Sequence, residues 1–173
     1  MSDSPITQNK DKQNAVVGVG DLAVSNKATD MLSTYALGSC IAIVAYDSQA
    51  KAGGIIHFML PDSSLSPQKA QGQPTMFADT GIPMLFRTLV GLSAERERIK
   101  TFVAGGASVI TGSDMFKIGE RNILAAKKVM SALAVSVVKA DIGGVSNRTL
   151  HLDIATGEVL LKTTRGTAKI DLA

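Results

Sequence analysis

The chain has 173 residues and a formal net charge of +3, and this length favours one domain. Hydrophobic residues make up 45% and charged residues 19%, so the chain can bury a core and wholesale disorder is excluded. A membrane-spanning helix needs about 20 apolar residues in a row, and every window of that length contains charge or glycine. The charge bias is mild and lacks Lys/Arg runs, so it does not favour nucleic-acid binding; it fits an acidic protein partner at least as well.

Polar residues dominate the start of the chain. Residues 1–14 are predicted to form a disordered N-terminal arm, and residues 15–173 a single domain. The arm has no apolar signal core, so the protein is predicted to be cytoplasmic. The Val-rich segment 15–24 predicts a first strand, punctuated by Gly18 and Gly20, and residues 26–33 are expected to form a connection.

Two apolar runs without a polar face follow. Residues 37–46 and 53–60 are rich in β-branched side chains and predict strands that are buried on both faces, with a turn at 47–52. Residues 61–76 contain Pro, Ser, Gln and Gly, which predicts a loop. Loops of this length in a compact domain are often functional.

Helical spacing appears twice in the second half of the chain. Asp79 or Thr80 is expected to cap a helix with Pro83 in its first turn, and a second helix is expected from about residue 120 to 133. Further strands are predicted at 101–104, 135–140, 148–154 and 158–163. About seven strands with two helices, mostly in hairpin-like order, indicate an α+β fold with a mixed sheet rather than a doubly wound one.

Cys40 is the single cysteine of the chain, which excludes a disulfide scaffold and a cysteine-rich zinc site. The two histidines, His57 and His151, cannot by themselves form a strong metal site. His57 lies within the second apolar run. His151 shares one face of its predicted strand with the polar residues Thr149 and Asp153 and is predicted to face solvent.

The predicted hairpin brings Cys40 and His57 together. A tight turn near residues 48–50 pairs positions whose numbers add up to about 97 or 99. In the first register Cys40 faces His57; in the second it faces Met59 and has His57 as its diagonal neighbour. Both registers place the two side chains on one face of the sheet, whereas an even register would separate them.

A thiol beside an imidazole has a recognisable chemistry. A free thiol has a pKa of about 8.5, and an imidazole can take its proton and hold the thiolate as an ion pair. The same imidazole can protonate a leaving group and activate water. Gly38 and Ser39 let the backbone approach Cys40, whose amide N–H is a candidate oxyanion donor. The alternative is a structural one, since free cysteines and strand histidines are common in ordinary cores.

Several motifs resemble the CheD family of chemoreceptor glutamine deamidases. They are LGSC at 37–40, Gly53-Gly54, HFMLP at 57–61, Gly105-Gly106-Ala107, IGERN at 118–122, DIGG at 141–144 and Arg148. The resemblance covers roughly residues 16–163. Two positions depart from the family pattern, because Asn147 stands where glycine is common and Phe77 where tyrosine is common.

The resemblance implies a Cys-His-Thr triad, which falls on Cys40, His57 and Thr34. From the residues alone, Thr34 is a hydroxyl in a connection, and Ser33 is an equal rival for the group that orients His57. The implied reaction is hydrolysis of glutamine side-chain amides to glutamate, without a metal or an organic cofactor. The implied fold has two packed β-layers with helices on an outer face, similar to the catalytic domain of cytotoxic necrotizing factors.

The resemblance also implies partners. These are the cytoplasmic helices of methyl-accepting chemoreceptors as substrate, and a CheC-type phosphatase; neither nucleic-acid binding nor membrane insertion is expected. Two other functions stay open. One is a different thiol acyl-transfer enzyme, such as a peptidase or a transglutaminase-like enzyme, that uses the same pair. The other is a non-catalytic partner-binding module in which Cys40 is inert.

Overall fold

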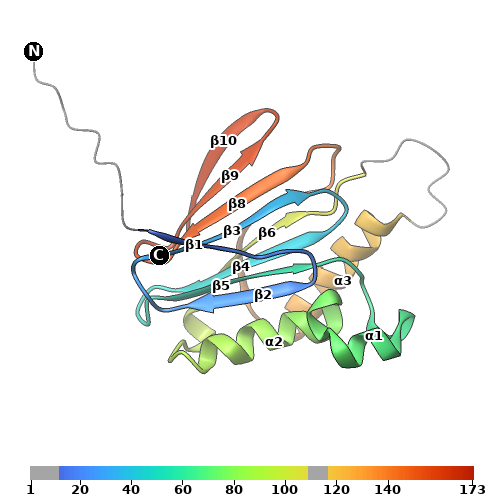
Figure 1. Cartoon of the computed structure of the whole chain (residues 1–173), viewed down its shortest axis with the longest axis horizontal. Coiled ribbons are helices and arrows are strands. Elements are labelled where there is room, and N and C mark those ends of the chain that lie inside the picture. Colours follow the sequence, from blue (N-terminus) through green and yellow to red (C-terminus); the bar gives the residue numbers. More distant parts are fainter. Residues whose placement is uncertain (1–11, 109–116) are drawn as a thin grey trace, which may run out of the picture.

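A computed structural model describes residues 12–108 and 117–173. Two five-stranded sheets pack face to face, and helices cover the outer face of one of them (Figure 1). The first sheet has the order β1-β3-β8-β9-β10 and the second β2-β5-β4-β6-β7. The predicted α+β class, with mixed sheets in two layers and helices outside, is confirmed.

The two sheets and the helices consist of the following elements. The first sheet contains β1 (Gln13–Val16), β3 (Asp30–Leu37), β8 (Arg148–Asp153), β9 (Glu158–Thr163) and β10 (Gly166–Asp171). The second contains β2 (Asp21–Ser25), β4 (Ile41–Asp47), β5 (Ala52–Phe58), β6 (Lys100–Gly105) and β7 (Ser136–Ile142). The helices are α1 (Pro67–Gly72), α2 (Ala78–Val90) and α3 (Ile118–Ala132), with 3₁₀ turns at Ser63–Leu65, Pro74–Met76 and Arg96–Arg98.

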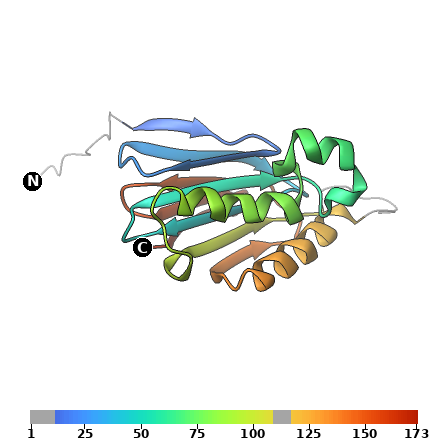
Figure 2. The same cartoon turned by 90° about the horizontal axis from the view of Figure 1, so that it is seen from below.

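Strand β4 explains why the sequence around it is apolar throughout. Its side chains alternate between two cores, as the twofold period of a strand requires. Ala42, Val44 and Tyr46 face the first sheet and join the core between the sheets. Ile41 and Ile43 face the other way, into the core beneath α2 and α3. Figure 2 shows these two helices lying side by side across the second sheet, so β4 and β5 are covered on both faces.

The N-terminal part of the domain differs from its prediction. The expected strand over 15–24 is two short strands, β1 and β2, in different sheets, because the chain turns at Gly20, whose φ is +77°. Residues 1–11 of the predicted disordered arm lie outside the described residues, and β1 begins at Gln13.

The expected connection over 26–33 is wrong in its second half. Strand β3 begins at Asp30 and pairs antiparallel with β8 in the first sheet. The chain then crosses to the second sheet through a bend at residues 38–40, so the apolar strand begins at Ile41 rather than at Leu37. Thr34 therefore lies inside a buried strand, in the sheet that faces the hairpin.

The segment between the hairpin and α2 is more regular than a loop. Residues 61–76 contain α1 and two 3₁₀ turns. Neither predicted cap of α2 has that role, because Thr80 Oγ1 donates to the Pro74 carbonyl and the Asp79 carboxylate accepts from Ser63. Strand β10 was not predicted. None of the helices in the described ranges is long and apolar enough to cross a membrane.

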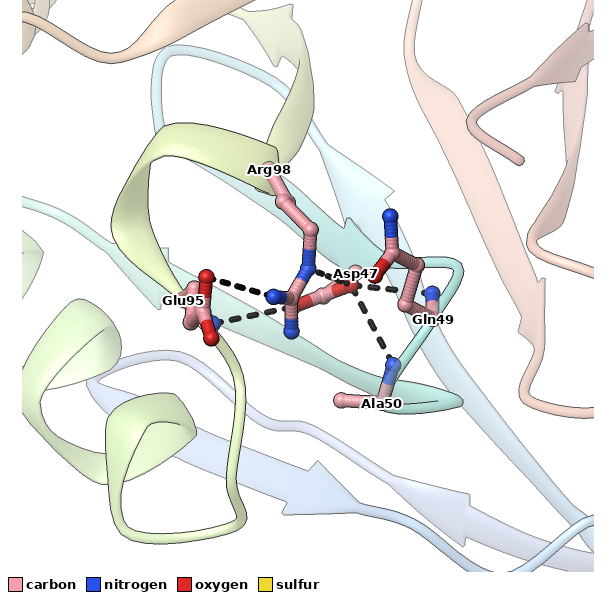
Figure 3. A network of polar contacts seen from close by, with 5 residues as sticks. All are labelled: Asp47, Gln49, Ala50, Glu95 and Arg98. Carbon is pink, nitrogen blue, oxygen red and sulfur yellow. Dashed lines mark hydrogen bonds and ion pairs between the residues drawn. The ribbon is translucent and has the colours of Figure 1, made fainter.

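Asp47 anchors the turn of the β4–β5 hairpin (Figure 3). Its buried carboxylate accepts hydrogen bonds from the backbone N–H groups of Gln49, Ala50 and Glu95, and pairs with the Arg98 guanidinium at 2.8 Å. Burial alone would raise the pKa of Asp47, but Arg98 and the three N–H groups lower it to about 2. The turn end of the hairpin thus holds a fully paired charge.

Candidate functional site

The open end of the same hairpin carries Cys40 and His57. Strand β4 pairs with β5 so that Ile41 lies opposite Phe58 and Ala42 opposite His57. Extending this register one residue beyond the strand places Cys40 opposite Met59, with His57 as its diagonal neighbour. This is the second of the two predicted registers. Cys40 is half-buried and packs against the core between the two sheets, the face that His57 shares through its partner Ala42.

Thr34 reaches His57 from the facing sheet. Its Oγ1 lies 2.9 Å from His57 Nδ1, and it also donates to the Val17 carbonyl at 2.7 Å. A hydroxyl has one hydrogen, so Thr34 must accept from Nδ1–H. The proton of the neutral ring is therefore on Nδ1, and the lone pair is on Nε2. Nε2 is buried and has no hydrogen-bond partner among the described residues.

Ser33, the rival of Thr34 in the sequence, points to the other face of β3. Its Oγ donates to Asn14 Oδ1 at 2.6 Å and lies 2.7 Å from His151 Nδ1. His151 does not simply face solvent as predicted; it is half-buried and its ring makes an edge contact with Tyr35. The structure thus brings Thr34 to His57, and Ser33 to His151.

Burial keeps both His57 and Cys40 neutral. It lowers the pKa of His57 to about 4, although Asp21 acts in the opposite direction. Burial also raises the pKa of the Cys40 thiol above its ordinary value. At neutral pH both groups are therefore uncharged. This differs from the preformed thiolate–imidazolium pair expected from the sequence, because the two sheets remove the water that would solvate those charges.

The segment Gly38–Cys40 is held by its carbonyl groups. The Gly38 carbonyl accepts from Ala107 N and the Cys40 carbonyl from Gly106 N, both at 2.8 Å. The Ser39 carbonyl accepts from Asn122 Nδ2 at 3.0 Å. By contrast, the N–H groups of Ser39 and Cys40 donate to no other residue within the described ranges. The bend thus leaves two donors beside the sulfur unpaired among the described residues, while its carbonyl groups are all hydrogen-bonded.

The two glycine pairs have different roles. A Cβ on Gly105 would lie 2.1 Å from the Cys40 carbonyl oxygen, and Gly105 adopts a φ of +117°. At this pair the backbone therefore approaches the segment that carries Cys40 closely. Gly143 and Gly144 also have positive φ, but a Cβ there would meet nothing within 4 Å. They lie in an open bend between β7 and β8.

Asn122 is the site residue that the sequence analysis did not single out. It is fully buried on α3, and its Nδ2 donates to the Ser39 carbonyl at 3.0 Å and to the Met59 carbonyl at 2.9 Å. A signal was present: Asn122 lies four positions before buried Ala126, so it is a polar residue on an apolar helix stripe. Over residues 12–108 and 117–173, no group of three or more His, Cys, Asp or Glu side chains is placed to hold a metal ion.

The fold and the site define a class: an α+β protein with a thiol, an imidazole and a hydroxyl gathered between two sheets. Comparison with known proteins then gives the family. The family model of CheD, described as chemotactic sensory transduction, matches residues 59–163. A protein of Syntrophus aciditrophicus named "Probable chemoreceptor glutamine deamidase CheD 1" is 46% identical over 151 residues, covering 87% of this chain and 94% of that protein. The chain belongs to the CheD family.

Two further comparisons add to this. A protein of Solibacter usitatus named "Probable chemoreceptor glutamine deamidase CheD" is 42% identical over 147 residues, covering 85% of this chain and 87% of that protein. The family model begins after His57 and does not cover Thr34, Cys40 or His57. The match to the Solibacter protein does cover them, because any stretch of 147 residues in a chain of 173 includes residues 34–57. The crystal structure of Neisseria meningitidis protein NMB0706 has a TM-score of 0.51 and 9% identity, covering 80% of this chain and 67% of that one. That likeness concerns the fold alone; the similarity to cytotoxic necrotizing factors stays a prediction.

Proposed function

We propose that this chain hydrolyses glutamine side-chain amides of chemoreceptors to glutamate, with Cys40 as nucleophile, His57 as base and Thr34 as the residue that positions His57. The observation that carries the proposal is the pair of hydrogen bonds from Val17 through Thr34 to His57. They leave Nε2 without a partner among residues 12–108 and 117–173, on the face of the sheet that also carries Cys40. Membership of the CheD family supports the substrate class.

The reaction begins from the neutral pair. As the Cys40 sulfur attacks the amide carbon, its proton passes to His57 Nε2 and the carbonyl oxygen becomes an oxyanion. The N–H groups of Ser39 and Cys40 are the donors available to that oxygen. His57 then gives the proton to the leaving nitrogen, ammonia departs, and a thioester to Cys40 remains.

Water completes the cycle. His57 Nε2 takes a proton from water as the water oxygen attacks the thioester, and the same proton returns to the sulfur when the carbon–sulfur bond breaks. The product is a glutamate, and the enzyme regains its neutral thiol and imidazole. Throughout, Thr34 accepts from Nδ1–H, which keeps the ring in one tautomer and one orientation.

The same proposal includes a setting and partners. Chemoreceptor helices in the cytoplasm are the substrate, so we place the chain there. A CheC-type phosphatase is a second partner under this proposal. Each deamidation adds one negative charge to the receptor helix, and this creates a carboxylate that reversible methylation can neutralise.

The test is mass spectrometry of a purified receptor cytoplasmic fragment after incubation with the protein. We expect a Gln-to-Glu mass change at specific sites and release of ammonia, both absent with Cys40→Ala. Incorporation of an added primary amine in place of water would instead identify an acyl-transfer enzyme. If no receptor fragment changes in mass and Cys40 is also unreactive toward alkylation, the chain is a non-catalytic partner-binding module instead.

A further inference from the structure

Asn122 joins two parts of the site that come from different elements. Its Nδ2 donates both to the Ser39 carbonyl, directly before Cys40, and to the Met59 carbonyl, two residues after His57. An amide nitrogen has two hydrogens, so both are used. The opposite orientation of the amide would place its oxygen against two carbonyl oxygens, which excludes it. One side chain therefore connects the nucleophile bend to the end of the strand that carries His57.

The first turn of α3 also packs closely against the segment that holds this bend. A Cβ on Gly119 would lie 2.7 Å from the Gly106 carbonyl oxygen and 2.8 Å from that of Ala107. Gly106 and Ala107 are the residues whose N–H groups hold the Cys40 and Gly38 carbonyls. The start of α3 thus supports the bend directly through Asn122 and indirectly through the 105–107 segment.

Asn122 has an incomplete set of hydrogen bonds. Its side chain has no exposed surface, and its Oδ1 is buried without a hydrogen-bond partner among the described residues. An apolar side chain would remove this unpaired acceptor, but it would also leave the Ser39 and Met59 carbonyls without the donor that they share. The contribution of Asn122 therefore lies in the two carbonyls that it holds, one in each half of the site.

We propose that Asn122 is a positioning residue, which fixes the nucleophile bend against the His57 strand so that the Cys40 sulfur meets Nε2 of His57. For the reaction it serves, the inference rests on the proposed function. The effect on geometry can be tested without assuming that reaction, because without Asn122 His57 should no longer influence the reactivity of Cys40. A displacement of about 1 Å in such a pair can lower turnover about 100-fold.

Alkylation by iodoacetamide measures that influence directly. The chain has one cysteine, so the rate reports Cys40 alone. Rates are compared in wild type, His57→Ala, Asn122→Ala and the double variant at pH 7. We expect His57→Ala to slow alkylation about 10-fold in the wild-type background and less than about 2-fold beside Asn122→Ala. Asn122→Asp, which keeps the side-chain size but removes both donors, is the second variant if the alanine variant does not fold.

The control is Met130→Ala, which removes a buried apolar side chain two turns along the same helix. It should lower the melting temperature and leave the His57 effect on alkylation intact. With a receptor fragment that still carries its glutamines as substrate, the Asn122 variants should lose kcat about 10- to 100-fold while KM changes little.

Equal slowing by His57→Ala in both backgrounds would overturn the inference, and so would a wild-type rate that does not depend on His57. The proposed function is tested separately. If wild type deamidates the receptor fragment and the Asn122 variants do so equally well, the positioning role is wrong and the function stands. If wild type deamidates nothing but the coupling depends on Asn122, the positioning role stands and the function is wrong.

Discussion

The β4–β5 hairpin is built differently at its two ends. At the turn, the buried Asp47 carboxylate has a partner for its charge and hydrogen bonds from three backbone groups. At the open end, His57 Nε2 has no partner among the described residues, and both ionisable side chains are neutral. The comparison teaches that burial alone does not determine the charge of a group. Asp47 stays charged because hydrogen-bond donors replace its water, whereas His57 stays neutral because it is buried and no acceptor among the described residues would stabilise a proton on Nε2.

The largest effect is expected at the open end. Cys40→Ala and His57→Ala should each lower kcat by about 1000-fold or more, because nucleophile and base act in one proton transfer. The double variant should be about as inactive as either single variant. Ammonia release from a receptor fragment measures this, and circular dichroism shows whether the fold is retained. Substantial turnover by Cys40→Ala would show that another group is the nucleophile.

Thr34 should have the next largest effect. Thr34→Ala removes the acceptor for His57 Nδ1–H and should lower kcat about 10- to 100-fold, while Thr34→Ser keeps the hydroxyl and should retain much of the activity. Ser33→Ala is the matched control, because Ser33 is the adjacent buried hydroxyl and bonds His151 instead. Damage by Ser33→Ala without damage by Thr34→Ala would reverse the assignment.

The pH dependence of kcat/KM sharpens the comparison further. His57 must be neutral to accept a proton, and its lowered pKa of about 4 keeps it neutral in mild acid. We therefore expect the acidic limb of the profile near pH 4, where an ordinary histidine would place it near its pKa of about 6.5. Activity should be nearly unchanged between pH 7 and 5.5. A loss centred near pH 6.5 would indicate that the imidazole is solvated in the working enzyme.

The smallest effect on turnover is expected from the turn end. Arg98→Ala leaves the Asp47 carboxylate buried beside backbone donors alone and should lower the free energy of unfolding, with kcat within about 2-fold of wild type. Because the folded pKa of Asp47 is depressed, this contribution is present above its unfolded pKa of about 4 and lost as pH falls toward 2. Urea unfolding at pH 7 and pH 3 measures the difference, which should shrink at the lower pH.

The hairpin was predictable because its signal is local. A tight turn between two apolar runs allows few registers, and both odd ones place Cys40 and His57 on one face. Strand β3 was not predictable in the same way. Its residues alternate between Thr34 at the core and Ser33 on the outer face, and only pairing with β8, more than 100 residues later, decides which hydroxyl meets His57.

The charge state of the site also depends on distant contacts. Thr34 and Val17 determine the tautomer of His57, and the facing sheet removes the water around it. Sequence spacing contains neither fact. Asn122 is intermediate: a polar residue on an apolar stripe is visible in the sequence, but its two carbonyl partners come from segments 83 and 63 residues away.

The position of Thr34 has a consequence for how activity responds to damage. Under the proposed function, His57 lies in the second sheet and Cys40 in the bend that leads into it, while Thr34, which orients His57, belongs to the first sheet. Activity therefore senses the alignment of the two sheets, and a partly opened sandwich that retains both sheets would already have lost its orienting bond. Deamidase activity should decline before the far-ultraviolet signal during gradual denaturation, so that the enzyme is a reporter of its own inter-sheet packing.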